Sequence, residues 1–142
     1  MNPTNLLLDI FDACIKIYSV ICRRPHVTAR VQFTPQRDRS GEVTKELMAL
    51  TIINESSPEV DVQEVWFLTS FKRPVSSTHI DAKLPVKVRG RDRTTYFVPF
   101  EDLKAALNKN VAETIAEVVI LDKTGRKHIG RVGRAAAAEF AS

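Results

Sequence analysis

The sequence predicts a mainly β chain of the α+β class: an antiparallel β-sandwich of about seven short strands, with a long N-terminal helix and one short helix between strands. Three observations predict this architecture. Several segments alternate apolar and polar side chains with a period of two. Polar turns rich in Gly, Pro, Asn and Asp separate these segments at short intervals. The first apolar segment, residues 6–22, instead spaces its polar residues as a helix does.

The predicted N-terminal helix runs from Leu6 to Cys22, with Thr4 as its N-cap and Pro25 as its stop. Its polar side chains fall within a narrow sector, so about three quarters of its circumference is apolar, whereas a surface helix shows a stripe of about 100°. One face of a sheet does not cover that much apolar surface. We therefore expect the helix to drive self-association or docking onto a partner. The stripe expected to do so consists of Leu7, Phe11, Cys14, Tyr18 and Ile21.

This N-terminal segment is a poor candidate for a signal peptide or a transmembrane span. Residues 6–22 barely reach the length that crosses a bilayer, and Asp9, Asp12 and Lys16 interrupt them. Cys14 and Cys22 lie about 12 Å apart along the helix, too far for a disulfide. A reducing compartment fits two unpaired thiols, so we expect a cytoplasmic protein without a transmembrane span.

The strands of the sandwich are expected after Pro25. The alternation and the turns predict strands at residues 26–33, 47–53, 60–68, 84–88, 94–100, 115–121 and 127–132. A short helix is predicted at 101–108. The chain therefore divides into an N-terminal helix at residues 1–24, a β-sandwich domain at 25–134 and a C-terminal tail at 135–142. The composition, 44% hydrophobic and 27% charged, is that of one ordinary globular domain.

The alternation slips once, inside the segment 60–68. Val60 and Val62 share one face, and then Val65 and Phe67 take the other parity. One extra residue in a strand produces such a slip, so the pattern predicts a β-bulge near Gln63 and Glu64.

The strands and turns "MALTIINESSPEVDVQEVWF", "LPVKV", "TTYFVPFEDL" and "AEVVILDKTGRKH" resemble small bacterial immunoglobulin-like β-sandwich domains. The resemblance covers residues 27–132. It implies that Trp66 fills a central core position, while the cysteine pair of antibody domains is absent and the leading helix is a departure. A resemblance of fold implies no particular function.

The sequence offers no catalytic, cofactor or metal site. His26, His79 and His128 lie in three separate segments, and no Cys-x-x-Cys or His-x-x-x-His spacing occurs. His128 is expected at the surface or rim of the sheet rather than as a ligand. Cys14 has no histidine nearby in sequence to activate it. We therefore expect a protein that is not an enzyme and that binds no cofactor and no metal.

Basic residues form the one non-random pattern in a chain whose net charge is only +4. They gather in two hairpins, which form one positive face if they are neighbours in space. The expected anion-binding residues are Lys87, Arg89, Arg91, Arg93, Arg126, Lys127 and Arg131. The competing interpretation is a solvated edge, because charged edge strands prevent pairing between sheets.

These observations lead to two functions. The first is a non-enzymatic protein-interaction or scaffolding module, a homo-oligomer or partner-docking protein that acts through its N-terminal helix. The alternative is a nucleic-acid or polyanion binder that uses the arginine hairpins, since Arg suits bidentate recognition of phosphate.

Overall fold

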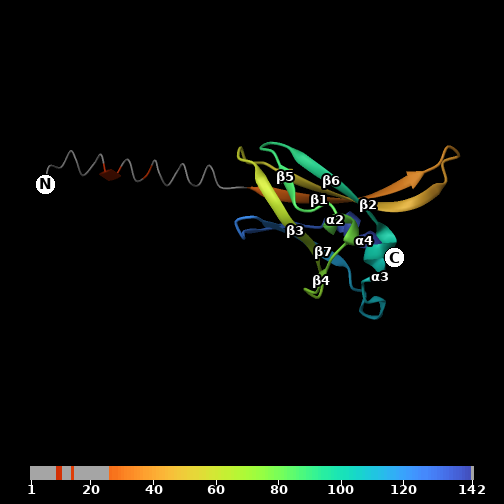
Figure 1. Cartoon of the computed structure of the whole chain (residues 1–142). Coiled ribbons are helices and arrows are strands. Elements are labelled where there is room, and N and C mark those ends of the chain that lie inside the picture. The colour runs from red at the N-terminus through yellow and green to blue at the C-terminus, as the bar shows by residue number, and fades with distance from the viewer. Residues whose placement is uncertain (1–8, 11–13, 15–25, 142) are drawn as a thin grey trace.

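The computed structural model describes residues 9–10, 14 and 26–141 (Figure 1). Strands dominate this part of the chain and form two antiparallel sheets, which confirms the mainly β prediction. Asp9, Ile10 and Cys14 are helical and exposed. The remainder of the predicted helix lies outside the described residues, as do four members of its stripe: Leu7, Phe11, Tyr18 and Ile21. Among the described helices, none has the length and apolar character that a membrane span requires.

The first sheet is a three-stranded layer in which β2 occupies the centre. Its order is β1-β2-β6, with β1 at Val27–Arg37, β2 at Val43–Asn54 and β6 at Arg93–Pro99. All pairings in it are antiparallel. Figure 1 shows these strands on one side of the domain.

The second sheet lies opposite the first. Its order is β4-β3-β7-β8, and β5 also pairs with β3, on the edge that β4 uses. The strands are β3 at Val60–Thr69, β4 at Pro74–Val75, β5 at Val86–Val88, β7 at Ile115–Asp122 and β8 at Lys127–Arg131. Because β4 and β5 contact opposite ends of β3, no described strand pairs with residues 63–66 on that edge.

Short helices close the ends and one side of the sandwich. They are α2 at Thr78–Asp81, α3 at Phe100–Ala105, the 3₁₀ turn η1 at Lys109–Val111 and α4 at Arg134–Ala141. The predicted short helix at 101–108 corresponds to α3. Residues 135–141, set apart as a tail on sequence grounds, lie in α4 and add Ala136 and Phe140 to the core, where the Phe140 ring lies 4.7 Å from that of Phe100.

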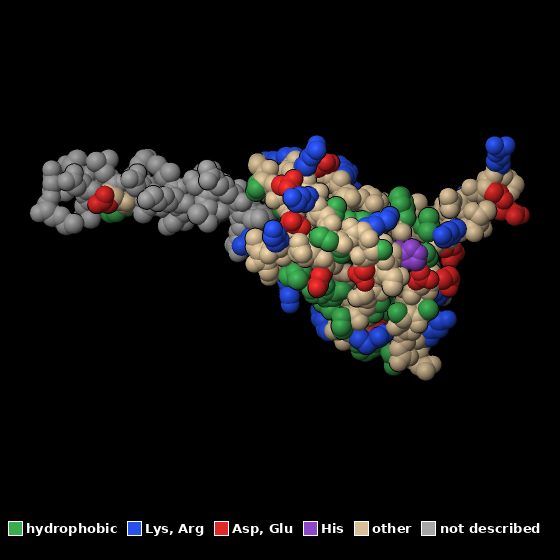
Figure 2. Space-filling model, in the orientation of Figure 1, with side chains coloured by type: hydrophobic (Ala, Val, Ile, Leu, Met, Phe, Trp, Pro, Cys, Tyr) green, Lys and Arg blue, Asp and Glu red, His purple; other side chains and the backbone are tan. Residues whose placement is uncertain are grey.

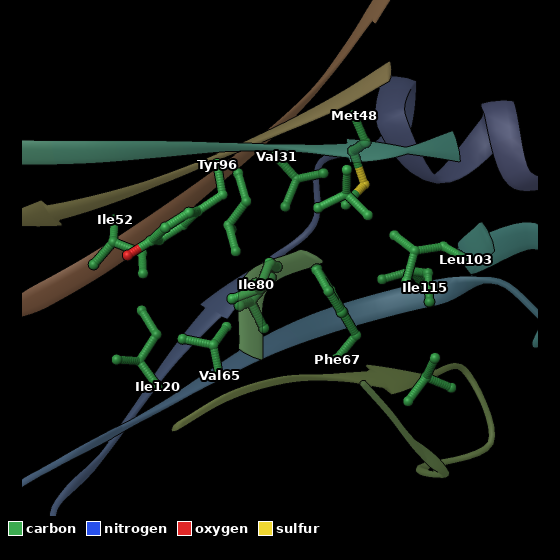
Figure 3. Packing of buried hydrophobic residues seen from close by; sticks show 14 of the residues in the cluster. Val31, Met48, Ile52, Val65, Phe67, Ile80, Tyr96, Leu103, Ile115 and Ile120 are labelled. Atoms are coloured by element: carbon green, nitrogen blue, oxygen red, sulfur yellow. The ribbon is translucent and has the colours of Figure 1, made fainter. Parts of the chain in front are cut away.

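The core fills the space between the sheets with side chains from alternate strand positions. Phe67 and Val65 of β3 point into it beside Ile80 of α2 (Figure 3). The register of β3 against β7 shifts between Val62 and Glu64, which confirms the predicted bulge.

The prediction that Trp66 fills the core is wrong, and the bulge is the reason. Beyond it Val65 and Phe67 face inward, so Trp66 lies on the outer face of the sheet and is half-buried. Phe67, whose side chain has no exposed surface, takes the central place instead. The Nζ of Lys127 lies 5.8 Å from the centre of the Trp66 ring, within cation–π range.

The polar turn between β2 and β3 fixes the loop between β5 and β6. Buried Asn54 donates from Nδ2 to the carbonyls of Pro58 (2.8 Å), Val88 (3.1 Å) and Arg89 (3.2 Å). Gly90 lies so close to this turn that a Cβ there would come within 1.8 Å of a backbone oxygen. The loop that carries Arg89, Arg91 and Arg93 is therefore held on a rigid base.

Candidate interaction surfaces

Several titratable side chains of the described region form ion pairs or hydrogen bonds that connect loops. No group of three or more His, Cys, Asp or Glu residues able to hold a metal occurs within the described part of the chain. His26 pairs with Glu55 at 3.0 Å and His79 lies 3.4 Å from Asp102, all four side chains being largely exposed. Two buried carboxylates, those of Asp122 and Glu113, are fully engaged in hydrogen bonds.

The prediction that His128 lies at the surface is wrong, because β8 pairs with β7 so that His128 faces inward opposite Ile120. Only 8% of it is exposed, and its Nε2 lies 2.9 Å from Oδ2 of Asp122. Burial raises the pKa of Asp122, but hydrogen bonds from Thr124 and His128 outweigh burial and hold that pKa below its ordinary value. The pair fixes the turn between β7 and β8.

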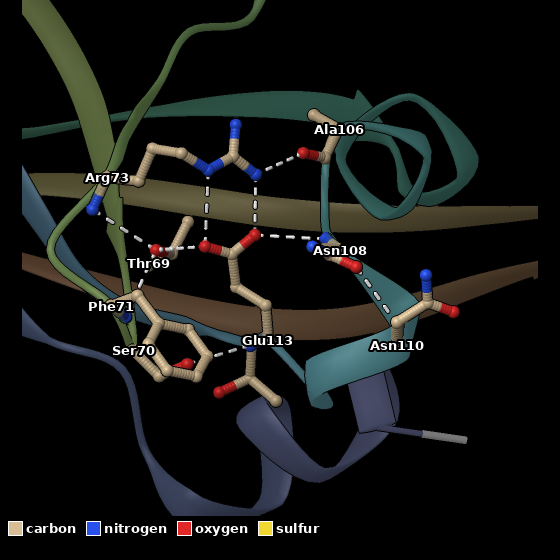
Figure 4. A network of polar contacts seen from close by, with 9 residues as sticks. Thr69, Ser70, Phe71, Arg73, Ala106, Asn108, Asn110 and Glu113 are labelled. Atoms are coloured by element: carbon tan, nitrogen blue, oxygen red, sulfur yellow. Dashed lines mark hydrogen bonds and ion pairs between the residues drawn. The ribbon is translucent and has the colours of Figure 1, made fainter.

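The second carboxylate, Glu113, joins two loops at the opposite end of the sandwich (Figure 4). Arg73 contacts it through Nη2 (2.5 Å to Oε1) and Nε (3.2 Å to Oε2). Thr69 Oγ1 and the backbone N–H of Asn108 donate to it at 2.7 and 3.0 Å. The hydrogen bond from Arg73, followed by those from Thr69 and Asn108, lowers the pKa of Glu113 from 4.5 to about 2. A carboxylate this acidic serves as a brace and not as a proton carrier near neutral pH.

The outer face of β3, β7 and β8 carries an apolar row across three strands. The register places Trp66 beside Val119, and Val119 beside Ile129. We call these three residues the Trp66 row. Ile129 is 60% exposed, while Val119 lies between its two neighbours and is buried. Figure 2 shows hydrophobic side chains gathered on the lower side of the domain, where Figure 1 places β3 and β7.

Two further rows flank the Trp66 row, and each carries two charged side chains. The row on one side is Glu64, Leu121 and Lys127, and the row on the other side is Leu68, Glu117 and Arg131. Glu64, Lys127 and Arg131 are exposed, and Glu117 forms an ion pair with Lys72 at 2.8 Å. We call the three rows together the outer β-face. An apolar centre inside a charged rim is the usual composition of a protein-binding surface.

A groove of about 550 Å³ borders this face where β3 has no neighbour between β4 and β5. Trp66, Glu64, Leu84 and Asp81 are among the residues that line it. The outer β-face therefore continues into a concave edge rather than ending at a paired strand.

The sequence analysis did not identify the outer β-face, although the slip in the alternation of β3 indicates part of it. Once the bulge shifts the parity of β3, Glu64, Trp66 and Leu68 must share a face opposite to Phe67. β7 is apolar at both parities, so its outward residue Val119 looks like any other core residue in the sequence.

The structure brings together only part of the predicted anion-binding set. Lys87, Arg89, Arg91 and Arg93 lie at the end of the sandwich that also carries the turn with Arg126, because Val62 pairs with both Val86 and Asp122. Lys127 lies over Trp66 on the outer β-face. Arg131 lies at the other end of β8, opposite Glu117.

Acidic side chains lie among these basic residues. Glu55, Glu59, Asp61 and Asp92 belong to the same loops and strand ends.

Comparison with protein-family models, with curated proteins and with solved structures finds no match to this chain.

The brace around Glu113 predicts a specific acid sensitivity. Its folded pKa of about 2 lies below the unfolded value of 4.5, so the unfolded chain takes up this proton first as the pH falls. The stabilisation is complete above about pH 4.5 and is lost between there and about pH 2. Glu113→Gln is expected to lower the free energy of unfolding at pH 7 and to flatten its decline in this window.

Urea denaturation at pH 7, 4 and 3 measures the effect. The matched control is Glu59→Gln, which removes an exposed carboxylate that forms no ion pair with the described residues. A Glu113→Gln profile parallel to that of the unmodified chain would contradict the assignment.

Proposed function

We propose that this chain is a non-enzymatic protein-interaction module that binds a protein through its outer β-face. One observation carries the proposal: the single tryptophan of the chain lies on this face and not in the core, in a row with an isoleucine that is 60% exposed. Tryptophan is enriched among the residues that dominate binding energy at interfaces.

The Trp66 row leaves apolar surface in contact with water. A large apolar side chain left exposed forfeits about 1.5–3 kcal/mol of burial relative to the interior. Isolated exposed residues of this kind are common, but half-buried Trp66 and exposed Ile129 flank buried Val119 in one row, beside Leu68 and Leu121. A partner that covers the row recovers this free energy, whereas folding alone does not.

We also infer that the sandwich is immunoglobulin-like. The order of the strands supports this: the first, second and sixth form one sheet, and the third, seventh and eighth form the other, as strands A, B, E and C, F, G do in immunoglobulin domains. Self-association through the predicted N-terminal helix stays a prediction, because most of that helix lies outside the described residues. The cytoplasmic location also stays a prediction.

Site-specific photo-crosslinking tests the proposal. The photoreactive residue p-benzoylphenylalanine replaces Ile129 in the full chain, which is produced in cells of its source and irradiated. The matched control carries it at Phe97, which is 53% exposed on β6 of the other sheet. We expect a discrete product from position 129 and none from position 97. Trp66→Ala should reduce the product about tenfold or more, as for an aromatic centre of binding energy.

Two further outcomes bear on the role of the face. Ile129→Thr keeps the β-branched shape, so we expect it to change the free energy of unfolding by less than about 0.5 kcal/mol. A much larger loss would mean that the row serves folding. Equal product patterns from positions 129 and 97 would contradict a specific binding face.

Polyanion binding is a second candidate function, favoured by the backbone of Arg91. Its φ of 63° lies in the left-handed region, which costs a non-glycine residue about 1 kcal/mol. Arg91 is exposed, and neither it nor Arg89 or Arg93 forms an ion pair with the described residues. A strained, unpaired arginine between two others suits contact with phosphates better than it suits folding.

Arg91→Gly separates the two roles of this residue. Glycine relieves the strained backbone, so stability should stay equal or rise by up to about 1 kcal/mol. Binding of a labelled single strand should weaken, and the log-log dependence on salt should flatten by about 0.7 for one lost phosphate contact. Fluorescence anisotropy across a salt series measures both, with Arg134→Ala at the opposite end as the control. Absence of binding at low salt would remove this candidate.

A further inference from the structure

We propose that the protein which the outer β-face binds is a second copy of this chain, docked face to face about a two-fold axis that runs along β7. This inference rests on the proposed function of that face. A two-fold axis lying in the interface along the central strand leaves β7 opposite itself and exchanges β3 with β8. The pattern of side chains on the three strands is complementary under this exchange.

The apolar centre meets apolar surface. The exchange sets Trp66 against the partner's Ile129, and Ile129 against the partner's Trp66. Val119 and Leu121 of β7 face their own counterparts near the axis. A half-buried aromatic residue and an exposed β-branched residue thus cover each other twice in one interface, as expected for a surface that pairs with itself.

The charged rim meets opposite charge. The exchange sets Glu64 against the partner's Lys127, and Lys127 against the partner's Glu64, which gives two identical ion pairs. Glu64 is exposed and forms no ion pair with the described residues. The Nζ of Lys127 lies over the Trp66 ring, 5.8 Å from its centre, and so stands above the face. Complementary charges of this kind fix the orientation of a complex and suppress wrong ones.

The remaining row is compatible with the same axis. Leu68 meets the partner's Arg131, whose methylene stem packs on apolar surface while its head stays in water. Glu117 meets its own counterpart, but Lys72 already pairs with this carboxylate at 2.8 Å. A two-fold axis in the interface perpendicular to the strands gives poorer charge complementarity. It sets Lys127 against the partner's Arg131, which has the same charge, and it leaves Glu64 opposite the partner's Leu68.

The size of the face predicts a weak dimer. Nine residues on three strands cover less than the roughly 800 Å² per partner of a standard stable interface. Sheets that pack face to face cross at about 30°, which reduces the overlap of the outer rows further. We therefore expect a reversible dimer that forms at high concentration and dissociates on dilution.

Charge exchange between two variants of the full chain tests the proposal. Glu64→Lys sets like positive charges against each other across the axis, and Lys127→Glu sets like negative charges. Each variant alone should self-associate about tenfold or more weakly than the unmodified chain. A one-to-one mixture sets every altered charge against an opposite one, so dimerisation should return. Sedimentation velocity across a concentration series measures all four samples. Glu59→Lys, the same charge change away from the face, should leave the dimer unchanged.

Four outcomes would overturn the inference. They are a monomer at every concentration, an oligomer that neither variant weakens, a mixture that fails to restore the dimer, and a crosslink from position 129 to residues 1–25 of the same chain. An oligomer indifferent to these charges is the result expected of association through the N-terminal helix. Failure here leaves the proposed function testable on its own, because crosslinking from position 129 to a different protein would still support the outer β-face as a binding surface.

Discussion

The bulge in β3 is the constraint on which the rest of the structure depends. One additional residue near Gln63 reverses the parity of the strand, so every side chain after it changes face. Phe67 thereby enters the core, and Trp66 and Glu64 move to the outside. Without that residue, the outer β-face would contain neither the aromatic centre nor the acidic end that the proposed dimer requires. A single local irregularity thus supplies both the packing of the interior and the composition of the binding surface.

Buried polar braces hold both ends of the sandwich and leave its outer face free. Asn54 and the Asp122–His128 pair fix the loops at one end, and Glu113 with Arg73 fixes those at the other. Buried polar groups that are fully satisfied make such loops rigid. The three strands of the outer β-face are therefore presented by a stiff frame, which lowers the entropy lost on binding.

The sequence predicts the strands, the turns and the bulge, because these follow from the local alternation of side chains. It does not predict which side of β3 faces the core. The bulge shows that parity reverses, but the size of Trp66 favoured the interior, and both parities after the bulge are apolar. The sequence also does not predict which basic residues lie close together. Their positions depend on the pairing of β5 and β7 with β3, which connects residues far apart in the chain. The burial of His128 has a local cause, because its partner Asp122 lies only six residues away across the β7–β8 turn.

In the proposed dimer the outer β-face of this domain meets a copy of itself. Nuclear magnetic resonance of the ¹⁵N-labelled full chain during dilution tests this pairing most directly, because each amide reports on its own surroundings. We expect concentration-dependent shifts for amides of residues 64–68, 117–121 and 127–131, with β1, β2 and β6 unchanged. Spectra that do not depend on concentration, or shifts confined to other strands and loops, would contradict it.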